Sequence, residues 1–160
     1  MQFMCAAKEL TIDSDYQQIH LFDSGTTSEP WSGWGDDPMV LAEDAAGIRT
    51  GVNGDVTVVF EVTDGRVTDG EQAEHTVVEF SLLSVSGRLL VTSPTWGSDD
   101  AEELEVPPGR LRLRVSLSKQ PWLDYDYDED DDEDEDPADR QRIRIRCWPA
   151  EPSASVIVKS

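Results

Sequence analysis

The side chains with the greatest capacity for chemistry in this sequence are the carboxylates between Asp124 and Asp136. Every residue in this run except Tyr125 and Tyr127 is Asp or Glu, which gives eleven carboxylates. Acids occupy four liganding positions of a calcium-binding EF-hand loop, namely Asp124, Asp126, Asp128 and Glu135. However, Glu129 stands where that loop requires glycine, and neither flank has a helical pattern. The run therefore favours weak association with divalent ions over a specific calcium site.

A second interpretation of the run is an acidic arm that binds a basic protein, with nearby aromatic side chains as apolar contacts. Carboxylates in succession repel one another and have no apolar surface to bury, so we expect a disordered loop at about 120–139. Alternatively, the run is a solubilising insert that folds back onto the chain's own arginines. The predicted partner-binding residues are Trp122, Asp124, Tyr125, Asp126, Tyr127, Asp128, Glu129, Asp130, Asp131 and Asp132.

Arginines alternate with mostly apolar residues on both sides of the acidic run. This alternation predicts two strands that can pair with each other, each with an outward polar face at the surface. An alternative is a phosphate or carboxylate site, since guanidinium groups bind such anions in pairs of hydrogen bonds. The seven arginines are Arg110, Arg112, Arg114, Arg140, Arg142, Arg144 and Arg146, out of ten in the chain.

Residues suited to catalysis or metal binding are few. His20 and His75 are far from either cysteine in sequence, and both occupy strand positions compatible with a solvated face. Asp36 and Asp37 could act as an acid pair in a carboxylate-dependent hydrolase, but they are better explained as the turn and N-cap before a short helix. We therefore predict no catalytic residues, no metal ligands, no cofactor and no enzymatic activity.

The overall charge limits the possible partners. The formal net charge is -21, and it falls to about -10 without the acidic run. Such a field repels polyanions, so we expect a basic protein as the partner and no direct nucleic-acid binding. Cys5 and Cys147 form no disulfide framework, and the sequence shows neither a signal peptide nor a spanning segment. We expect a reduced, cytoplasmic protein that does not bind membranes.

Period-two alternation dominates the rest of the chain and predicts one all-β domain over residues 1–160. We expect an antiparallel β-sandwich of eight or nine strands with one short helix at Pro38–Ala46, and a barrel as the alternative. Asn53-Gly54 and Ser86-Gly87 are predicted to close two hairpins. The expected strands lie near 10–13, 18–21, 48–52, 55–63, 75–85, 88–92, 110–118, 141–148 and 153–159. The expected core residues are Val56, Val58, Phe60, Val62, Val78, Phe80 and Leu82.

Several short segments resemble the ComJ family of competence proteins. The segments are Glu9–Ile12, Ile19–Asp23, Ala45–Ile48, Val106–Leu113 and Cys147–Trp148. The resemblance implies a β-protein that inhibits a DNA-entry nuclease by direct binding. This chain departs from the family pattern by its acidic insert, which puts the identity of the target in doubt. No functional residues of the family can be transferred to positions here.

These observations together predict a small acidic protein that binds and inhibits a basic nuclease or toxin, as an inhibitor or immunity protein. Two alternatives remain. One is a metal- or ligand-binding β-module that uses the acidic loop, and the other is the hydrolase that would act through Asp36 and Asp37. The sequence does not indicate an oligomeric state.

Overall fold

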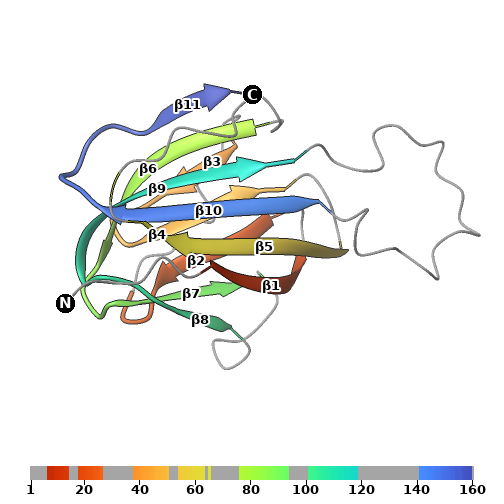
Figure 1. The fold of residues 1–160 in the computed structure, drawn as a ribbon, viewed down its shortest axis with the longest axis horizontal. Coiled ribbons are helices and arrows are strands. Elements are labelled where there is room, and N and C mark those ends of the chain that lie inside the picture. The colour runs from red at the N-terminus through yellow and green to blue at the C-terminus, as the bar shows by residue number, and fades with distance from the viewer. Residues whose placement is uncertain are drawn as a thin grey trace, which may run out of the picture.

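The computed structural model describes residues 7–14, 18–26, 38–50, 54–63, 65, 76–93, 101–118 and 141–159. These residues form two stacked β-sheets (Figure 1), so the prediction of an all-β sandwich is confirmed and the barrel alternative is wrong. They form eleven strands, more than the eight or nine expected. The described part of the chain contains no helix that could span a membrane.

The larger sheet has six strands in the order β1-β5-β10-β9-β6-β11. Neighbouring strands in this sheet run antiparallel, except for β5 and β10, which run parallel to each other. The pairing of β11 with β6 shifts register between Ile157 and Lys159. The strands are β1 (Ala7–Ser14), β5 (Gly54–Val62), β10 (Arg142–Pro149), β9 (Gly109–Leu117), β6 (Thr76–Ser84) and β11 (Val156–Lys159).

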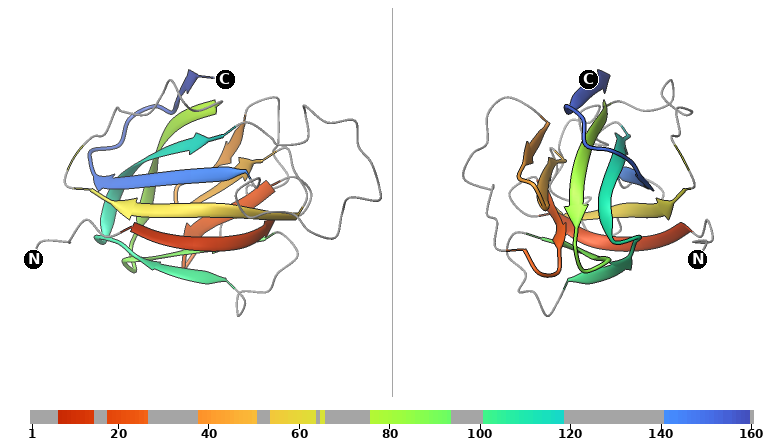
Figure 2. Two further views of the ribbon diagram at one scale, coloured as in Figure 1. Left: turned by 45° about the vertical axis from the view of Figure 1, so that its right-hand side comes forward. Right: turned by 90° about the vertical axis from the view of Figure 1, so that its left-hand side faces the viewer.

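The smaller sheet has five strands in the order β3-β4-β2-β7-β8, and all its pairs are antiparallel. The chain passes between the two sheets after β1, β4, β6 and β8. Figure 2 shows how the strands of the two sheets lie over one another. The strands are β3 (Met39–Leu41), β4 (Ala45–Arg49), β2 (Gln18–Asp23), β7 (Arg88–Thr92) and β8 (Glu102–Glu105).

The core lies between the sheets and is built mainly from alternate residues of the longer strands. On β9, for example, Leu111, Leu113, Val115 and Leu117 are buried in the core cluster. All seven core residues expected from the sequence are buried there as well. Burying an aliphatic side chain contributes about 1.5–3 kcal/mol, so this alternation supplies the main driving force for the sandwich.

Both predicted hairpins are wrong. The strands β4 and β5, which flank Asn53-Gly54, belong to different sheets and do not pair. The same is true of β6 and β7, which flank Ser86-Gly87. Asn53 itself lies outside the described residues. At the second turn Gly87 has a positive φ of 75°, and its carbonyl accepts a hydrogen bond from the backbone N–H of Val106 (3.0 Å). This turn therefore directs the chain across the sandwich instead of back along the same sheet.

The predicted helix at Pro38–Ala46 is also wrong, because β3 and β4 form a hairpin there. The backbone N–H of Ala42 donates to the carbonyl of Ala45 (2.8 Å), which closes the turn. The N–H groups of Asp23 and Leu83 donate to the carbonyls of Asp44 and Glu43 (2.9 and 2.8 Å). Packing against the core and these tertiary hydrogen bonds outweigh a helix-forming composition, which is a weak preference.

A buried carboxylate ties the two sheets together at one crossing. Asp23, at the end of β2, accepts hydrogen bonds from the hydroxyls of Ser84 (2.7 Å) and Ser86 (2.6 Å). It also accepts backbone hydrogen bonds from Gly25 (3.0 Å) and Ser86 (3.3 Å). Burial alone would raise the pKa of Asp23, but these hydrogen bonds outweigh it and the pKa is lowered. The ionised carboxylate is therefore part of the folded structure.

Candidate functional site

The arginines of β9 and β10 gather on the outward face of the six-stranded sheet, and these two strands pair as the sequence indicated. The prediction that their polar face lies at the surface is wrong at its centre. Arg112, Arg114 and Arg146 are 7%, 1% and 2% exposed. Elsewhere on the described face, Arg110 and Arg142 are exposed and Arg144 is half-buried. Alternation identified the face correctly, but it carries no information on whether that face is covered.

Four charged residues form a row across this face, one on each of four neighbouring strands. Arg114 of β9 lies opposite Glu79 of β6 on one side and opposite Arg146 of β10 on the other. Arg146 in turn lies opposite Glu61 of β5. Like charges that face each other directly destabilise a sheet, and here each end of the arginine pair meets a glutamate. The alternation of the arginine strands did not identify Glu79 as their partner. The available signal was that Glu79 is the one charged residue in the segment Thr76–Ser84.

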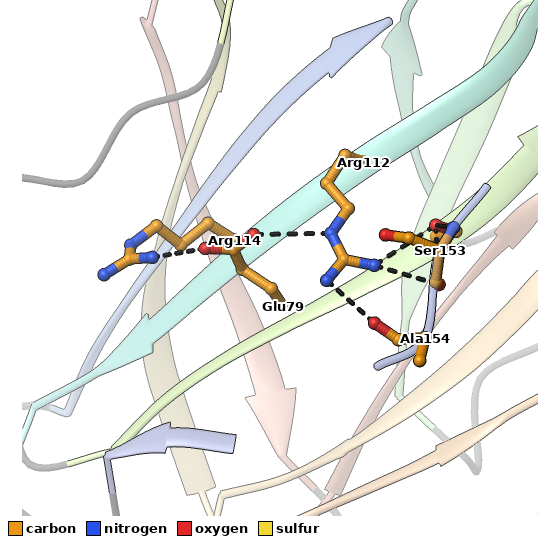
Figure 3. Close-up of polar contacts among 6 residues, drawn as sticks. Glu79, Arg112, Arg114, Ser153 and Ala154 are labelled. Carbon is orange, nitrogen blue, oxygen red and sulfur yellow. Dashed lines mark hydrogen bonds and ion pairs between the residues drawn. The ribbon is translucent and has the colours of Figure 1, made fainter. Parts of the chain in front are cut away.

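Glu79 holds two arginines with its two carboxylate oxygens (Figure 3). Its Oε1 accepts a hydrogen bond from Nε of Arg112 (3.3 Å), and its Oε2 pairs with Nη1 of Arg114. All three side chains are buried. A buried charge costs several kcal/mol unless an opposite charge and hydrogen bonds compensate it, so the three groups depend on one another.

Arg112 connects this network to the segment that precedes β11 (Figure 3). Its Nη1 donates to the carbonyl of Ser153 (3.2 Å), and its Nη2 donates to the carbonyl of Ala154 (3.0 Å). The hydroxyl of Ser81 also donates to the carbonyl of Ser153 (3.2 Å) and accepts from its N–H (3.1 Å). The planar guanidinium suits such a multiple contact, and it fixes the start of the edge strand.

Two further arginines form ion pairs near the margins of the face. Arg144 contacts Glu61 (3.3 Å), and Arg110 contacts Glu43 (3.2 Å). The side chains of both arginines are more than 40% exposed, so each pair contributes about 0–1 kcal/mol. The strong electrostatic interactions are therefore those at Glu79. Arg140 lies outside the described residues.

Most of the residues selected from the sequence as functional fall outside the described part of the chain. This applies to the acidic run and its whole predicted binding set: Trp122, Asp124, Tyr125, Asp126, Tyr127, Asp128, Glu129, Asp130, Asp131 and Asp132. It applies equally to Glu135, the candidate acids Asp36 and Asp37, and His75 and Cys5. Their roles stay predictions.

His20 and Cys147 are described, and neither is placed for reactivity. His20 was expected on a solvated face, but it is 7% exposed and its Nε2 forms a hydrogen bond with Oε1 of Gln18 (2.8 Å). Burial lowers the pKa of His20 to about 4, so the imidazole is neutral at pH 7. Burial also raises the pKa of the Cys147 thiol to about 12, which suppresses the reactive thiolate. No group of three potential metal ligands occurs among the described residues.

The described features define a two-sheet β-sandwich with a charged network on one outer face. Among solved structures, this fold is similar to that of ComJ from Bacillus subtilis, described as the inhibitor of the DNA-degrading activity of NucA. That similarity has a TM-score of 0.69 at 12% identity and covers 92% of this chain and all of the other. The crocagin biosynthetic protein J is also similar, with a TM-score of 0.65 at 18% identity over 93% of this chain and all of that chain.

No family model matches the sequence, and no curated protein matches it. At such low identity the similarity establishes the fold. It also confirms the predicted resemblance to ComJ at the level of the fold.

Proposed function

We propose that this protein is a non-enzymatic inhibitor that binds a basic protein, specifically a nuclease, and blocks its activity. The observation that carries the proposal is the similarity to ComJ over nearly the whole sandwich, since that protein is described as a nuclease inhibitor. Fold similarity alone does not fix function. The proposal therefore also depends on the charge of this chain.

The charge supports a protein target over a nucleic-acid target. The formal net charge of -21 opposes the approach of DNA or RNA but attracts a protein whose own surface binds DNA. Electrostatic attraction of this kind raises association rates and excludes partners of like charge. An inhibitor with this charge can compete for the surface that a nuclease uses for its substrate.

Within this proposal, the acidic run Asp124–Asp136 steers the partner, and Trp122 acts as an apolar anchor at the start of the run. Carboxylates along an extended arm present negative charge to a basic cleft much as phosphates do. Tryptophan is enriched among the residues that dominate binding energy at protein interfaces. Cytoplasmic action, as expected from the sequence, is part of the same proposal, and cell fractionation tests it.

Isothermal titration calorimetry of this protein against a purified basic nuclease, such as one found encoded beside its gene, tests the proposal. We expect saturable 1:1 binding that weakens as salt rises, because exposed charges are screened. Trp122→Ala should weaken binding by more than about 2 kcal/mol if Trp122 is an anchor. A buffer-matched acidic nuclease serves as the negative control. Absence of binding to the basic nuclease at low salt would refute the proposal.

A further inference from the structure

We propose that the outer edge of β11, which pairs with no second strand among the described residues, is the place where an extended segment of the basic partner adds to the six-stranded sheet. This inference rests on the proposed function and names the surface that it uses. A strand added at a sheet edge gains main-chain hydrogen bonds, while its side chains pack beside those of the edge strand. In Figure 1, β11 lies beyond β6 at one margin of the sheet.

The sheets have four edge strands, and β11 differs from the other three. Charged side chains or burial protect exposed edges against unwanted pairing. The β1 edge exposes Lys8 and Glu9, and the β8 edge exposes Glu103 and Glu105. The three residues of β3 are buried or half-buried. In contrast, Val156, Ile157 and Val158 of β11 are 48%, 42% and 36% exposed, and the one charged residue of this strand, Lys159, stands at its end.

The exposed side chains of β11 are apolar on both faces of the sheet. Val156 lies opposite Glu79 on the outward face, whereas Ile157 lies opposite Val78, which belongs to the core cluster. An added strand would therefore place side chains beside Val156 on one face and extend the core beside Ile157 on the other. Consecutive exposed aliphatic residues on an edge strand are a recognised site of strand addition.

The edge is also prepared for binding, because the segment before β11 is already fixed. Arg112 and Ser81 hold the backbone of Ser153, and Arg112 also holds that of Ala154. Arg112 is in turn held by the buried Glu79. An edge ordered before the partner arrives loses less conformational entropy on binding. The hydrogen bonds and ion pairs of Glu79, Arg112 and Arg114 therefore also fix the position of β11 before a partner binds.

A basic partner fits this edge better than a second copy of the chain does. Two copies would each bring a formal charge of -21. Pairing of two four-residue strands would involve far fewer than the roughly 20–30 residues per side of a stable interface. A basic partner gains attraction from the acidic surface as well as from the edge. We therefore assign the edge to an extended, partly apolar segment of that basic partner.

The experiment uses the 160-residue protein and the purified basic nuclease of the titration described above. Amide hydrogen exchange of residues 156–159 is measured with and without the nuclease, and binding is measured for Ile157→Asp and for the milder Val158→Thr. Val85→Asp is the matched control, because Val85 is 73% exposed but lies in the turn after β6. Circular dichroism and thermal unfolding establish that each variant is folded.

We expect protection of the 156–159 amides in the complex and at least about tenfold weaker binding for Ile157→Asp, with Val85→Asp unchanged. The added aspartate would favour a basic partner electrostatically, so weaker binding must come from the edge. If the nuclease binds both aspartate variants like the wild type without protecting β11, the edge assignment is wrong and the proposed function stands. If the nuclease does not bind the wild-type protein, the edge assignment and the proposed function are both wrong. Protection of β11 through self-association without nuclease would overturn the assigned occupant.

Discussion

Glu79 of β6 and Arg114 of β9 lie directly opposite each other and form an ion pair on the outward face of the six-stranded sheet, almost fully removed from solvent. The same carboxylate also holds Arg112, so one negative charge serves two buried positive charges. Each member of such a group depends on the others, because removing one leaves an uncompensated charge in a medium of low dielectric constant.

Replacing Glu79 with glutamine should therefore destabilise the protein strongly. The substitution keeps the side-chain shape but leaves Arg112 and Arg114 without their shared carboxylate. We expect the free energy of unfolding at pH 7 to fall by about 3–5 kcal/mol in urea denaturation. Glu43→Gln is the matched control, since the side chains of the Glu43–Arg110 pair are largely exposed and its loss should cost about 0–1 kcal/mol. Equal effects of the two substitutions would show that burial does not strengthen the Glu79 interactions.

Asp23→Asn should destabilise the protein at neutral pH and much less in acid. The ionised carboxylate accepts hydrogen bonds from Ser84, Ser86 and Gly25, and hydrogen bonds to a charged group contribute about 1.5–3 kcal/mol each. Because the pKa of folded Asp23 is below its unfolded value of about 3.9, this stabilisation is complete above pH 3.9 and is lost as the pH falls through the folded pKa. Urea titrations of both proteins between pH 7 and pH 2 measure the difference. A difference that does not depend on pH would argue against an ionised Asp23.

His20 should contribute a separate acid sensitivity at higher pH. Its pKa is about 4 in the folded state and about 6.5 when unfolded, so the unfolded chain binds the additional proton between these values. Stability is therefore complete above pH 6.5 and falls by up to roughly 3 kcal/mol as the pH drops to 4. His20→Gln should remove this pH dependence while keeping a polar side chain at the position. An unchanged profile between pH 6.5 and pH 4 in the variant would show that other groups cause it.

The sequence predicted the faces of the strands better than it predicted how the strands assemble. Alternation correctly placed Val78, Phe80 and Leu82 in the core, because a period of two directs every second side chain to one face. The same pattern does not specify which sheet a strand joins. The turn at Ser86-Gly87 was therefore expected to form a hairpin, although it links one sheet to the other.

The electrostatic network could be predicted only in part, for a similar reason. The alternation of Arg112 and Arg114 with leucines established their common outward face. Their burial and the partnership with Glu79 depend on strand order, since β6 becomes the neighbour of β9 only in the folded sheet. Local sequence carries no signal for a contact between residues that are 33 and 35 positions apart.

Neutralising the acidic run should slow the association with the basic nuclease. Replacing the Asp and Glu residues of Asp124–Asp136 with Asn and Gln removes eleven negative charges but keeps the length of the segment. We expect at least a tenfold lower association rate at low salt and a weaker dependence on salt, with little change in dissociation. Surface plasmon resonance at several salt concentrations measures both rates. Rates that are indifferent to neutralisation and to salt would make the run a solubilising segment.

The most direct test of nuclease inhibition is a DNA-degradation assay with the same purified basic nuclease that is used in the binding experiments. Increasing amounts of this protein are added at a fixed nuclease concentration, with ComJ and NucA as the positive control pair and heat-unfolded protein as the negative control. We predict that degradation stops near one equivalent of this protein when both components exceed their dissociation constant. Undiminished degradation at a tenfold excess of folded protein would contradict the proposed function.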